Sequence, residues 1–347
     1  MMTNILRITL RKPYLILVGD ETDTTYAKTG LGIVQWRGAD VAGQLRLSPA
    51  AVDLGVADLT IAEAARKRVG SLVVGVAPVG GKVPEAWWHS MREAAAAGLD
   101  VVAGLHTRLN DSPELVATAR KSGVGLIDVR VPPSPLPVGT GRKRSGLRLL
   151  TVGTDCAIGK KYTALAIERA MRDAGLPATF RATGQTGIMI AGEGMPIDAV
   201  VADFVSGAAE VLSPDNAPTH WDVIEGQGSL FHPGYSGVSL GLLHGSQPDA
   251  IVVCHDATRD RVSGWPHYAL PSLAECIEVH ERLARRTNPA ARVVGVSVNT
   301  SALPGTKRID YLAVLRDRHG LPAVDPLIDG CGDIVAHIKE SILQSTR

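Results

Sequence analysis

The sequence has few cysteines, and none is placed for a disulfide framework or a zinc site. Among its 347 residues are 4 cysteines, Cys156, Cys254, Cys276 and Cys331, which are widely spaced and form no CxxC pair. This usage argues against a small disulfide-bonded domain and against a zinc knuckle. Histidine, cysteine and carboxylate residues occur nowhere at metal-ligand spacing, so the sequence predicts no metal.

An excess of one charge and a long apolar run are also missing. Lys+Arg 36 against Asp+Glu 35 gives a net charge of +1, which does not favour nucleic acid or an anionic membrane as partner. No uncharged run is long enough to span a bilayer. The first residues, MMTNILRITLRKPY, lack the apolar centre of a signal peptide. A cytoplasmic enzyme is therefore expected, with the basic residues at 142–144 forming a solvated face.

Proline and glycine divide the chain before its midpoint. The segment 131–146, VPPSPLPVGTGRKRSG, contains four prolines, and neither a helix nor a central strand can run through it. The length and the 45% hydrophobic content suit two domains. We expect an N-terminal domain over 1–135, a linker over 136–146 and a C-terminal domain over 147–347.

Short apolar strands alternate with helices in both halves. In the first half the expected strands are 71–78, 99–106 and 124–131, with helices at 84–97 and 113–122. In the second half the expected strands are 147–153, 177–183, 221–226, 251–257 and 292–300, with helices at 159–174, 197–212 and 272–286. This alternation predicts an α/β protein, a small parallel domain followed by a doubly wound parallel sheet. Ligands of such sheets gather at the carboxyl ends of the strands.

The segment 149–163, LLTVGTDCAIGKKYT, has the pattern of a phosphate-binding loop. An apolar strand breaks into glycine, and a helix opens at Gly159 and Lys160. Backbone N–H groups, the lysine and the helix dipole would together attract an anion. The residues predicted to hold the phosphate are Gly153, Thr154, Asp155, Cys156, Ala157, Ile158, Gly159, Lys160, Lys161 and Tyr162.

This loop departs from the usual GxxxxGK[ST] pattern in two ways. Five residues separate Gly153 from Gly159, a spacing that resembles the loop of dethiobiotin synthetase. Lys161 stands where a hydroxyl would bind the Mg²⁺ of a nucleotide, and Thr163 could replace it only if the helix start were shifted. We favour a loop that holds a phosphate as a handle, as on coenzyme A, over one that cleaves it. A glycine turn without a ligand is the alternative.

Three side chains are candidates for a catalytic base. Glu225 stands where a predicted strand ends in glycines, and His232 follows it directly before a proline. Asp203 lies in the apolar stretch VVADFV, where a carboxylate is costly unless it is paired or used. Capping or packing would explain Glu225 and His232 equally well without catalysis.

Two further clusters offer substrate contacts. The glycine-rich segment 181–194 contains Arg181, Gln185 and Thr186, and the strand end at 253–260 contains His255 and Arg259. Arginine forks suit a carboxylate or a phosphate. An ordinary solvent loop and an interdomain salt bridge are the structural alternatives.

Six ordered motifs resemble one family. They are GGKVPEAWW, GLHTRLND, VGTDCAIGKKYTAL, ATGQTGIMIAGEG, EGQGSLFHP and GVSLGLLHGSQPDAIVVCHDATR. Together they are similar to the DgcN-type D-glutamate N-acetyltransferase family. The resemblance implies a Rossmann-like N-terminal domain, a P-loop C-terminal domain of dethiobiotin synthetase type, and acetyl transfer from acetyl-CoA to the amine of D-glutamate during D-glutamate breakdown.

Under that function the candidate residues receive roles. Glu225, or else Asp203 or His232, would take the proton of the ammonium group, and N–H groups near Gly226 and Gly228 would stabilise the oxyanion. The carboxylates of D-glutamate would bind Arg181 and Arg259, with Gln185, Thr186 and His255 as further contacts. The loop would hold the pyrophosphate of coenzyme A. A homo-oligomer is expected.

Two other functions stay open at this point. One is an ATP-dependent ligase or kinase of dethiobiotin synthetase type, with Mg²⁺ held by Thr163, Glu225 and Asp203. The other is a nucleotide-sensing partner protein that catalyses nothing. Lys161 counts against the first of these.

Overall fold

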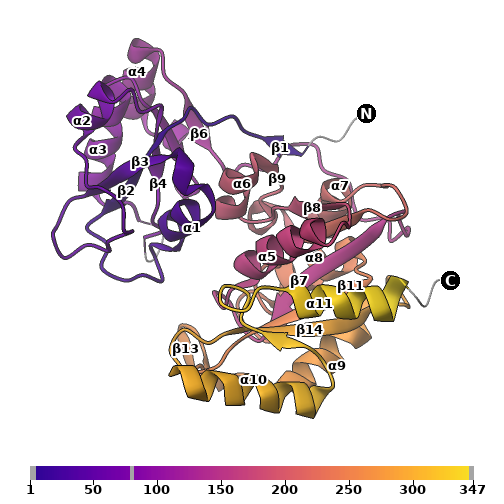
Figure 1. Cartoon of the computed structure of the whole chain (residues 1–347). Coiled ribbons are helices and arrows are strands. Elements are labelled where there is room, and N and C mark those ends of the chain that lie inside the picture. The colour runs from indigo at the N-terminus through magenta and orange to yellow at the C-terminus, as the bar shows by residue number, and fades with distance from the viewer. Residues whose placement is uncertain (1–4, 79–81, 344–347) are drawn as a thin grey trace. The chain divides into compact units, whose positions relative to one another are not determined.

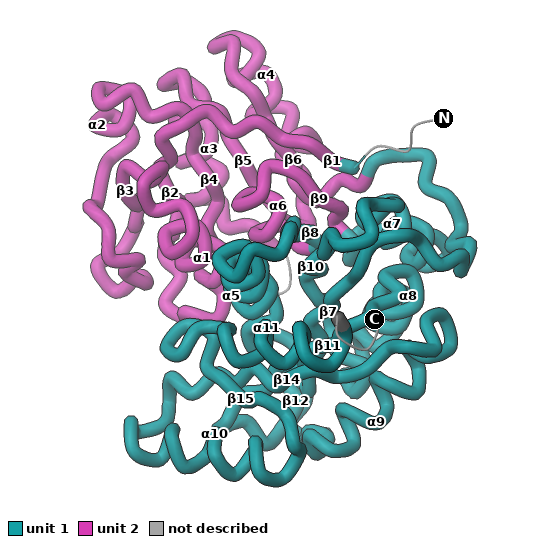
Figure 2. The backbone as a smooth tube through the Cα atoms, turned by 45° about the vertical axis from the view of Figure 1, so that its right-hand side comes forward, with its two compact units in different colours: residues 1–5, 133–183, 197–347 teal, residues 6–132, 184–196 magenta. Residues whose placement is uncertain are grey.

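The computed structural model describes residues 5–78 and 82–343, which form two compact units (Figure 1). Figure 2 colours unit 1, residues 1–5, 133–183 and 197–347, in teal, and unit 2, residues 6–132 and 184–196, in magenta. All four cysteines lie in the described part of the chain, and none of them forms a disulfide there. None of the helices within the described ranges is long and apolar enough to cross a bilayer.

Unit 2 is built on a parallel sheet in the order β3-β2-β4-β5-β6. Its strands are β2 (Tyr14–Gly19), β3 (Val41–Arg46), β4 (Ser71–Val74), β5 (Asp100–Ala103) and β6 (Leu126–Asp128). Its helices in the N-terminal half are α1 (Lys28–Arg37), α2 (Ile61–Arg66), α3 (Glu85–Ala96) and α4 (Pro113–Ser122). The three strands and two helices predicted from the sequence are present. Strands β2 and β3 were not predicted, although every residue of β2 is buried.

A short excursion from the C-terminal half completes unit 2. It consists of α6 (Gln185–Ala191) and β9 (Glu193–Gly194); β9 pairs antiparallel with β1 (Leu6–Arg7), and α6 packs on α1. The excursion leaves unit 1 after Thr183 and returns at Ile197, whose N–H donates to the Thr183 carbonyl at 3.0 Å. No break in the sequence pattern signals that these residues belong to the other unit.

Unit 1 is a parallel sheet in the order β15-β14-β11-β7-β10-β8, with β7 near its centre. Its strands are β7 (Leu147–Gly153), β8 (Ala178–Arg181), β10 (Trp221–Ile224), β11 (Ala250–Asp256), β14 (Arg292–Asn299) and β15 (Ala323–Val324). Helices α5 (Lys160–Asp173) and α11 (Gly332–Ile338) pack together on one face. Helices α7 (Val205–Leu212), α8 (Ser236–Ser246) and α9 (Leu273–Ala284) pack together on the other (Figure 1).

The two-domain α/β prediction is confirmed, with differences in detail. The helix expected at 197–212 begins as two 3₁₀ turns, Ile197–Ala199 and Ala202–Phe204, and only then becomes α7. Helix α10 (Gly305–His319) and an antiparallel hairpin of β12 (Arg261–Val262) and β13 (Trp265–Ala269) were not predicted. The hairpin proves important for the site described below.

A buried arginine fixes the start of the central strand. Arg148 in β7 is fully buried, and its Nε donates to Ser213 Oγ at 2.8 Å; that hydroxyl donates in turn to Asp222 at 2.7 Å. The rest of its guanidinium donates to the backbone carbonyls of Arg144, Ser145, Gly146 and Pro214. Arg144 is buried as well, so the prediction of a solvated cluster at 142–144 is wrong for that residue.

Replacing Arg148 with alanine should lower the free energy of unfolding by about 3–5 kcal/mol, because a buried charge network is broken and several carbonyls lose their donors. The matched control is Arg142→Ala, whose side chain is exposed and pairs with exposed Asp215. It should change the free energy by less than about 0.5 kcal/mol. Urea denaturation of the full chain measures both, and equal small losses would show that the Arg148 network contributes little.

Candidate functional site

The loop after β7 presents backbone donors where the sequence predicts an anion. Helix α5 begins at Lys160, and positive φ angles of 52° at Ala157 and 108° at Gly159 curl the chain before it. Within residues 5–78 and 82–343, the N–H groups of Ala157, Ile158 and Gly159 have no hydrogen-bond acceptor. Adjacent backbone donors at a helix N-terminus form a site for an anion.

Lys160 adds a buried positive charge to this loop. Its side chain is buried, and its Nζ donates to the Asp155 carbonyl at 2.6 Å. The ammonium group therefore lies against the loop. The Nζ of its neighbour Lys161 lies over the Tyr162 ring, 4.6 Å from the ring centre.

Asp155 locks the loop to the segment that leads into the hairpin. Its carboxylate accepts hydrogen bonds from the N–H of Cys156 (2.7 Å), the N–H of Ser263 (2.8 Å) and Nη1 of Arg259 (2.9 Å). The same Arg259 nitrogen donates to the Cys156 carbonyl at 2.8 Å. The predicted substrate arginine is thus committed to the loop in this structure, and its role with a substrate stays a prediction.

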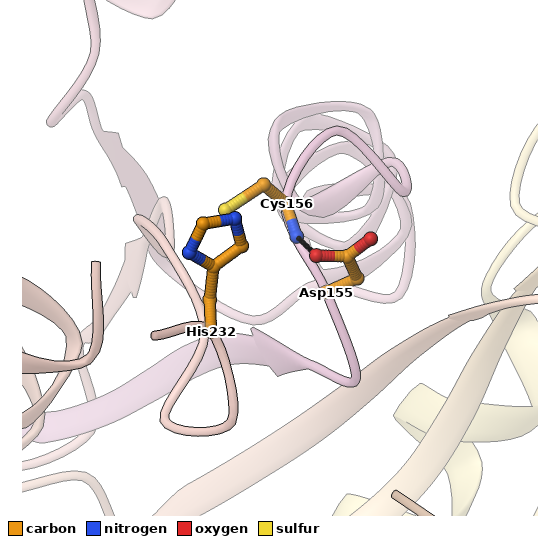
Figure 3. Close-up of side chains that lie close together, drawn as sticks. All are labelled: Asp155, Cys156 and His232. Atoms are coloured by element: carbon orange, nitrogen blue, oxygen red, sulfur yellow. Dashed lines mark hydrogen bonds between the residues drawn. The ribbon is translucent and has the colours of Figure 1, made fainter. Parts of the chain in front are cut away.

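Asp155, Cys156 and His232 lie close together, with their potential ligand atoms within 4.8 Å of one another (Figure 3). Spacing along the sequence does not reveal this group, because His232 is far from Asp155 and Cys156 in sequence. The residues do not fit a metal. The His232 Nδ1 accepts the Gly234 N–H at 3.1 Å, which places the proton of the neutral ring on Nε2, and Asp155 is occupied by three donors.

The same hydrogen bond bears on the predicted role of His232 as a base. The Nδ1 of this imidazole accepts a backbone N–H, and its Nε2 carries the proton. Its Nε2–H can therefore only donate a hydrogen bond. His232 is therefore arranged to donate, and the arrangement does not support a base at that position.

Glu225 is buried at the end of β10, the neighbour of β7 in the sheet. Its Oε2 accepts the N–H of Thr183 at 2.9 Å, and the Thr183 hydroxyl donates back to the Glu225 carbonyl at 2.7 Å. The carboxylate is therefore held in a fixed orientation at the edge where the loop lies. Among the three candidate bases, Glu225 has the support that a catalytic carboxylate needs.

The position after Glu225 has room only for glycine. A Cβ there would lie 1.7 Å from the Thr151 carbonyl oxygen, so no other residue fits. Its N–H donates to the Thr151 hydroxyl at 2.9 Å. The predicted use of the Gly226 N–H as an oxyanion donor is therefore wrong in this structure.

The other predicted residues are distributed more widely. Asp203 is exposed on a 3₁₀ turn, so the argument from an apolar environment does not apply to it. Arg181 Nε donates to buried Asp222 at 2.8 Å. Gln185 and Thr186 belong to unit 2, where the Thr186 hydroxyl bonds that of Thr29 at 2.8 Å.

His255 connects the loop to helix α10. Its Nδ1 lies 3.2 Å from the Thr154 hydroxyl and its Nε2 lies 3.0 Å from the Tyr311 hydroxyl. Burial lowers the pKa of His255 below its usual 6.5, with neighbouring Asp256 opposing that change. A neutral ring that bridges two hydroxyls is suited to holding the loop in place.

The hydroxyl that an ATP site would need is occupied. Thr163 Oγ1 is buried, lies 2.7 Å from Ser297 Oγ and accepts a contact from the Cys254 thiol. Because α5 begins at Lys160, the helix start is not shifted toward Thr163. This arrangement counts against Thr163 as a Mg²⁺ ligand.

Two family models match this chain. Residues 44–132 match a Rossmann-like domain of unknown function (DUF1611_N), and residues 137–335 match a P-loop domain of unknown function (DUF1611_C). The chain belongs to the DUF1611 family. The family expected from the sequence motifs and the Rossmann-like and P-loop domains expected with it are thereby confirmed.

Two relatives of this DUF1611 chain have a named activity. A protein of Tritonibacter scottomollicae is 47% identical over 94% of this chain and 98% of its own length, and one of Pseudoalteromonas sp. is 45% identical over 95% and 99%. Both are named D-glutamate N-acetyltransferase. The crystal structure of a DUF1611 family protein from Anabaena variabilis matches with a TM-score of 0.87 at 34% identity, over 95% of this chain and 99% of that one.

The DUF1611 chain also contains a buried histidine that the sequence analysis did not single out. His280 in α9 bonds the Cys276 carbonyl through Nδ1 at 2.7 Å, and burial lowers the pKa of His280 to about 4. In the unfolded chain a histidine titrates near 6.5. Between these values the unfolded state binds a proton that the folded state does not. The contribution of His280 to the free energy of unfolding is therefore fully present above the unfolded pKa and is lost as the pH falls.

The expected slope is about 1.4 kcal/mol of unfolding free energy per pH unit between pH 6.5 and about 4. His280→Gln should remove that slope, while His267→Gln on the exposed hairpin should leave it intact. Urea midpoints measured across this pH range test the prediction. An unchanged slope in His280→Gln would mean that His280 titrates alike in both states.

Proposed function

We propose that this DUF1611 chain transfers the acetyl group of acetyl-CoA to the amine of D-glutamate. The observation that carries the proposal is the loop at 153–160. Its N–H groups at 157–159 have no acceptor among the described residues, Lys160 is buried in it, and the oriented carboxylate of Glu225 lies at the end of the neighbouring strand. The names of the two relatives supply the substrate. D-glutamate breakdown, a cytoplasmic location and a homo-oligomeric state belong to the same proposal.

The loop would bind acetyl-CoA through its phosphates. Coenzyme A has a pyrophosphate, and the three N–H groups of Ala157, Ile158 and Gly159 with the Lys160 ammonium are suited to it. No nucleophile or Mg²⁺ is needed at such a site, because the phosphates are held and not cleaved. The long, flexible pantetheine arm lets the thioester lie away from the loop, along the carboxyl edge of the sheet.

Glu225 would act as the general base. The α-ammonium group has a pKa of about 8, so it must lose a proton before its nitrogen can attack the thioester carbonyl. Attack forms the C–N bond and a tetrahedral oxyanion. Its collapse breaks the C–S bond, and the leaving thiolate of coenzyme A takes up the proton that the nitrogen gives up. His232 offers a fixed Nε2–H donor on the same side of the unit, and Arg259 and Arg181 remain proposed partners of the substrate carboxylates.

Release of the coenzyme A thiol tests this function. Purified protein is mixed with acetyl-CoA and D-glutamate, with L-glutamate, or with no amino acid, and a parallel reaction contains Mg²⁺-ATP in place of acetyl-CoA. Thiol release that depends on D-glutamate is the expected result. Phosphate release from ATP without thiol release would move the chain to the ligase or kinase class, and no reaction in any mixture would favour a binding protein.

A further inference from the structure

Two large aromatic side chains of unit 1 are exposed side by side. Tyr235, at the start of α8, is 49% exposed, and Trp265, at the start of β13, is 37% exposed. Their ring centres are 6.1 Å apart at an interplanar angle of 76°. We call this pair the aromatic step.

Buried His232 holds the aromatic step in place. Its ring stacks on Tyr235 with centres 4.4 Å apart, and Trp265 meets it edge-on at 4.5 Å. Its Nδ1 is fixed by the Gly234 N–H. The two exposed rings therefore pack on a rigid imidazole. They lose little conformational entropy when a planar ligand binds, because they are already held in place.

The aromatic step lies beside the predicted phosphate loop. The imidazole of His232 that supports it faces Cys156 of the loop (Figure 3). The hairpin that carries Trp265 is tied to the loop by the Ser263 N–H and the Arg259 guanidinium, both on Asp155. Hydrogen-bond donors suited to an anion and exposed aromatic rings thus lie close together within unit 1.

This juxtaposition fits a ligand that carries phosphate next to a planar base. We infer that the aromatic step binds the adenine ring of acetyl-CoA while the loop holds its phosphates, an inference that rests on the proposed function. In coenzyme A a ribose alone separates the adenine from the pyrophosphate, so both can bind at neighbouring surfaces. Arg259 precedes the hairpin and pairs with Asp155, and Arg261 lies in β12 and pairs with Asp260, so the inference rests on the backbone donors and the two rings. If a partner protein bound the aromatic step instead, the neighbouring N–H groups at 157–159 would have no anion to bind.

The adenine site is tested with Trp265→Ala and Tyr235→Ala in the full chain. Calorimetry measures the affinity of coenzyme A and of adenosine 3′,5′-bisphosphate, and kinetics compare acetyl-CoA with S-acetylpantetheine, which lacks the nucleotide. Each variant should bind coenzyme A roughly 5- to 100-fold more weakly, the range expected for the loss of one aromatic face under a base. Reaction with S-acetylpantetheine should be unchanged, and Trp265→Phe should bind nearly as wild type.

Tyr268→Ala is the matched control. Tyr268 is 51% exposed on the same hairpin strand, and it is not one of the rings that contact His232. Wild-type affinity for coenzyme A in both test variants, or an equal loss with S-acetylpantetheine, would overturn the adenine site. If the wild-type protein binds coenzyme A through these rings but transfers no acetyl group to D-glutamate, the proposed function fails while the adenine site stands.

Discussion

Replacing Glu225 with glutamine should lower kcat for acetyl transfer by about 10²- to 10⁴-fold, the usual contribution of a positioned general base. The carboxamide keeps an oxygen that can accept the Thr183 N–H, so the local fold should survive. What it loses is the ability to take the proton of the substrate ammonium group. The KM values of both substrates should change little, because the loss falls on the chemical step.

Asp203→Asn is the control for this prediction. Asp203 was a candidate base on the sequence alone, but it is exposed on a 3₁₀ turn and no buried partner orients it among the described residues. Its replacement should leave kcat within about twofold of wild type, as expected for a surface change. A large loss in Asp203→Asn with little loss in Glu225→Gln would exchange the two assignments.

Replacing Lys160 with methionine should raise the KM for acetyl-CoA roughly 10- to 100-fold, the equivalent of one charge-assisted hydrogen bond. Methionine preserves most of the buried aliphatic stem and removes only the ammonium group, which lies against the loop at 2.6 Å from the Asp155 carbonyl. The KM for D-glutamate should stay near its wild-type value. Initial rates with each substrate varied in turn measure both constants.

The neighbouring lysine provides the matched comparison. Lys161 Nζ lies 4.6 Å from the centre of the Tyr162 ring, and we expect Lys161→Met to raise the KM for acetyl-CoA less than Lys160→Met does. Equal losses for acetyl-CoA and D-glutamate in Lys160→Met would argue against a phosphate bound at Lys160. A second check is S-acetylpantetheine, whose KM should be insensitive to Lys160 because it lacks the pyrophosphate.

Much of the fold could be predicted because strands that are buried on both faces of a parallel sheet are continuously apolar. This holds for β4, β7, β11 and β14, which the sequence analysis placed correctly. The excursion at 184–196 could not be predicted, because its apolar helix would suit either unit and only tertiary pairing with β1 and α1 assigns it. The 3₁₀ turns at the start of the expected helix 197–212 depend on the same return to unit 1.

The candidate site shows where local patterns stop being informative. The loop and Glu225 were predicted because strand ends and glycines are signals within a few residues of each other. The contacts of Asp155 with Arg259 and Ser263, and of His232 with Cys156 and Trp265, join residues that are distant in sequence. Which nitrogen of His232 accepts a backbone N–H is a matter of ångström-scale geometry. That detail favours a donor over a base at His232, and its role stays a prediction.

The most direct test of acetyl transfer is the mass of the product formed from acetyl-CoA that carries a ¹³C-labelled acetyl group. The full chain is incubated with this donor and D-glutamate, and the amino-acid fraction is analysed by mass spectrometry, with L-glutamate in a parallel reaction. We expect labelled N-acetylglutamate from D-glutamate in amounts equal to the thiol released, and little from L-glutamate. Release of thiol without labelled product, or equal labelling of both enantiomers, would contradict it.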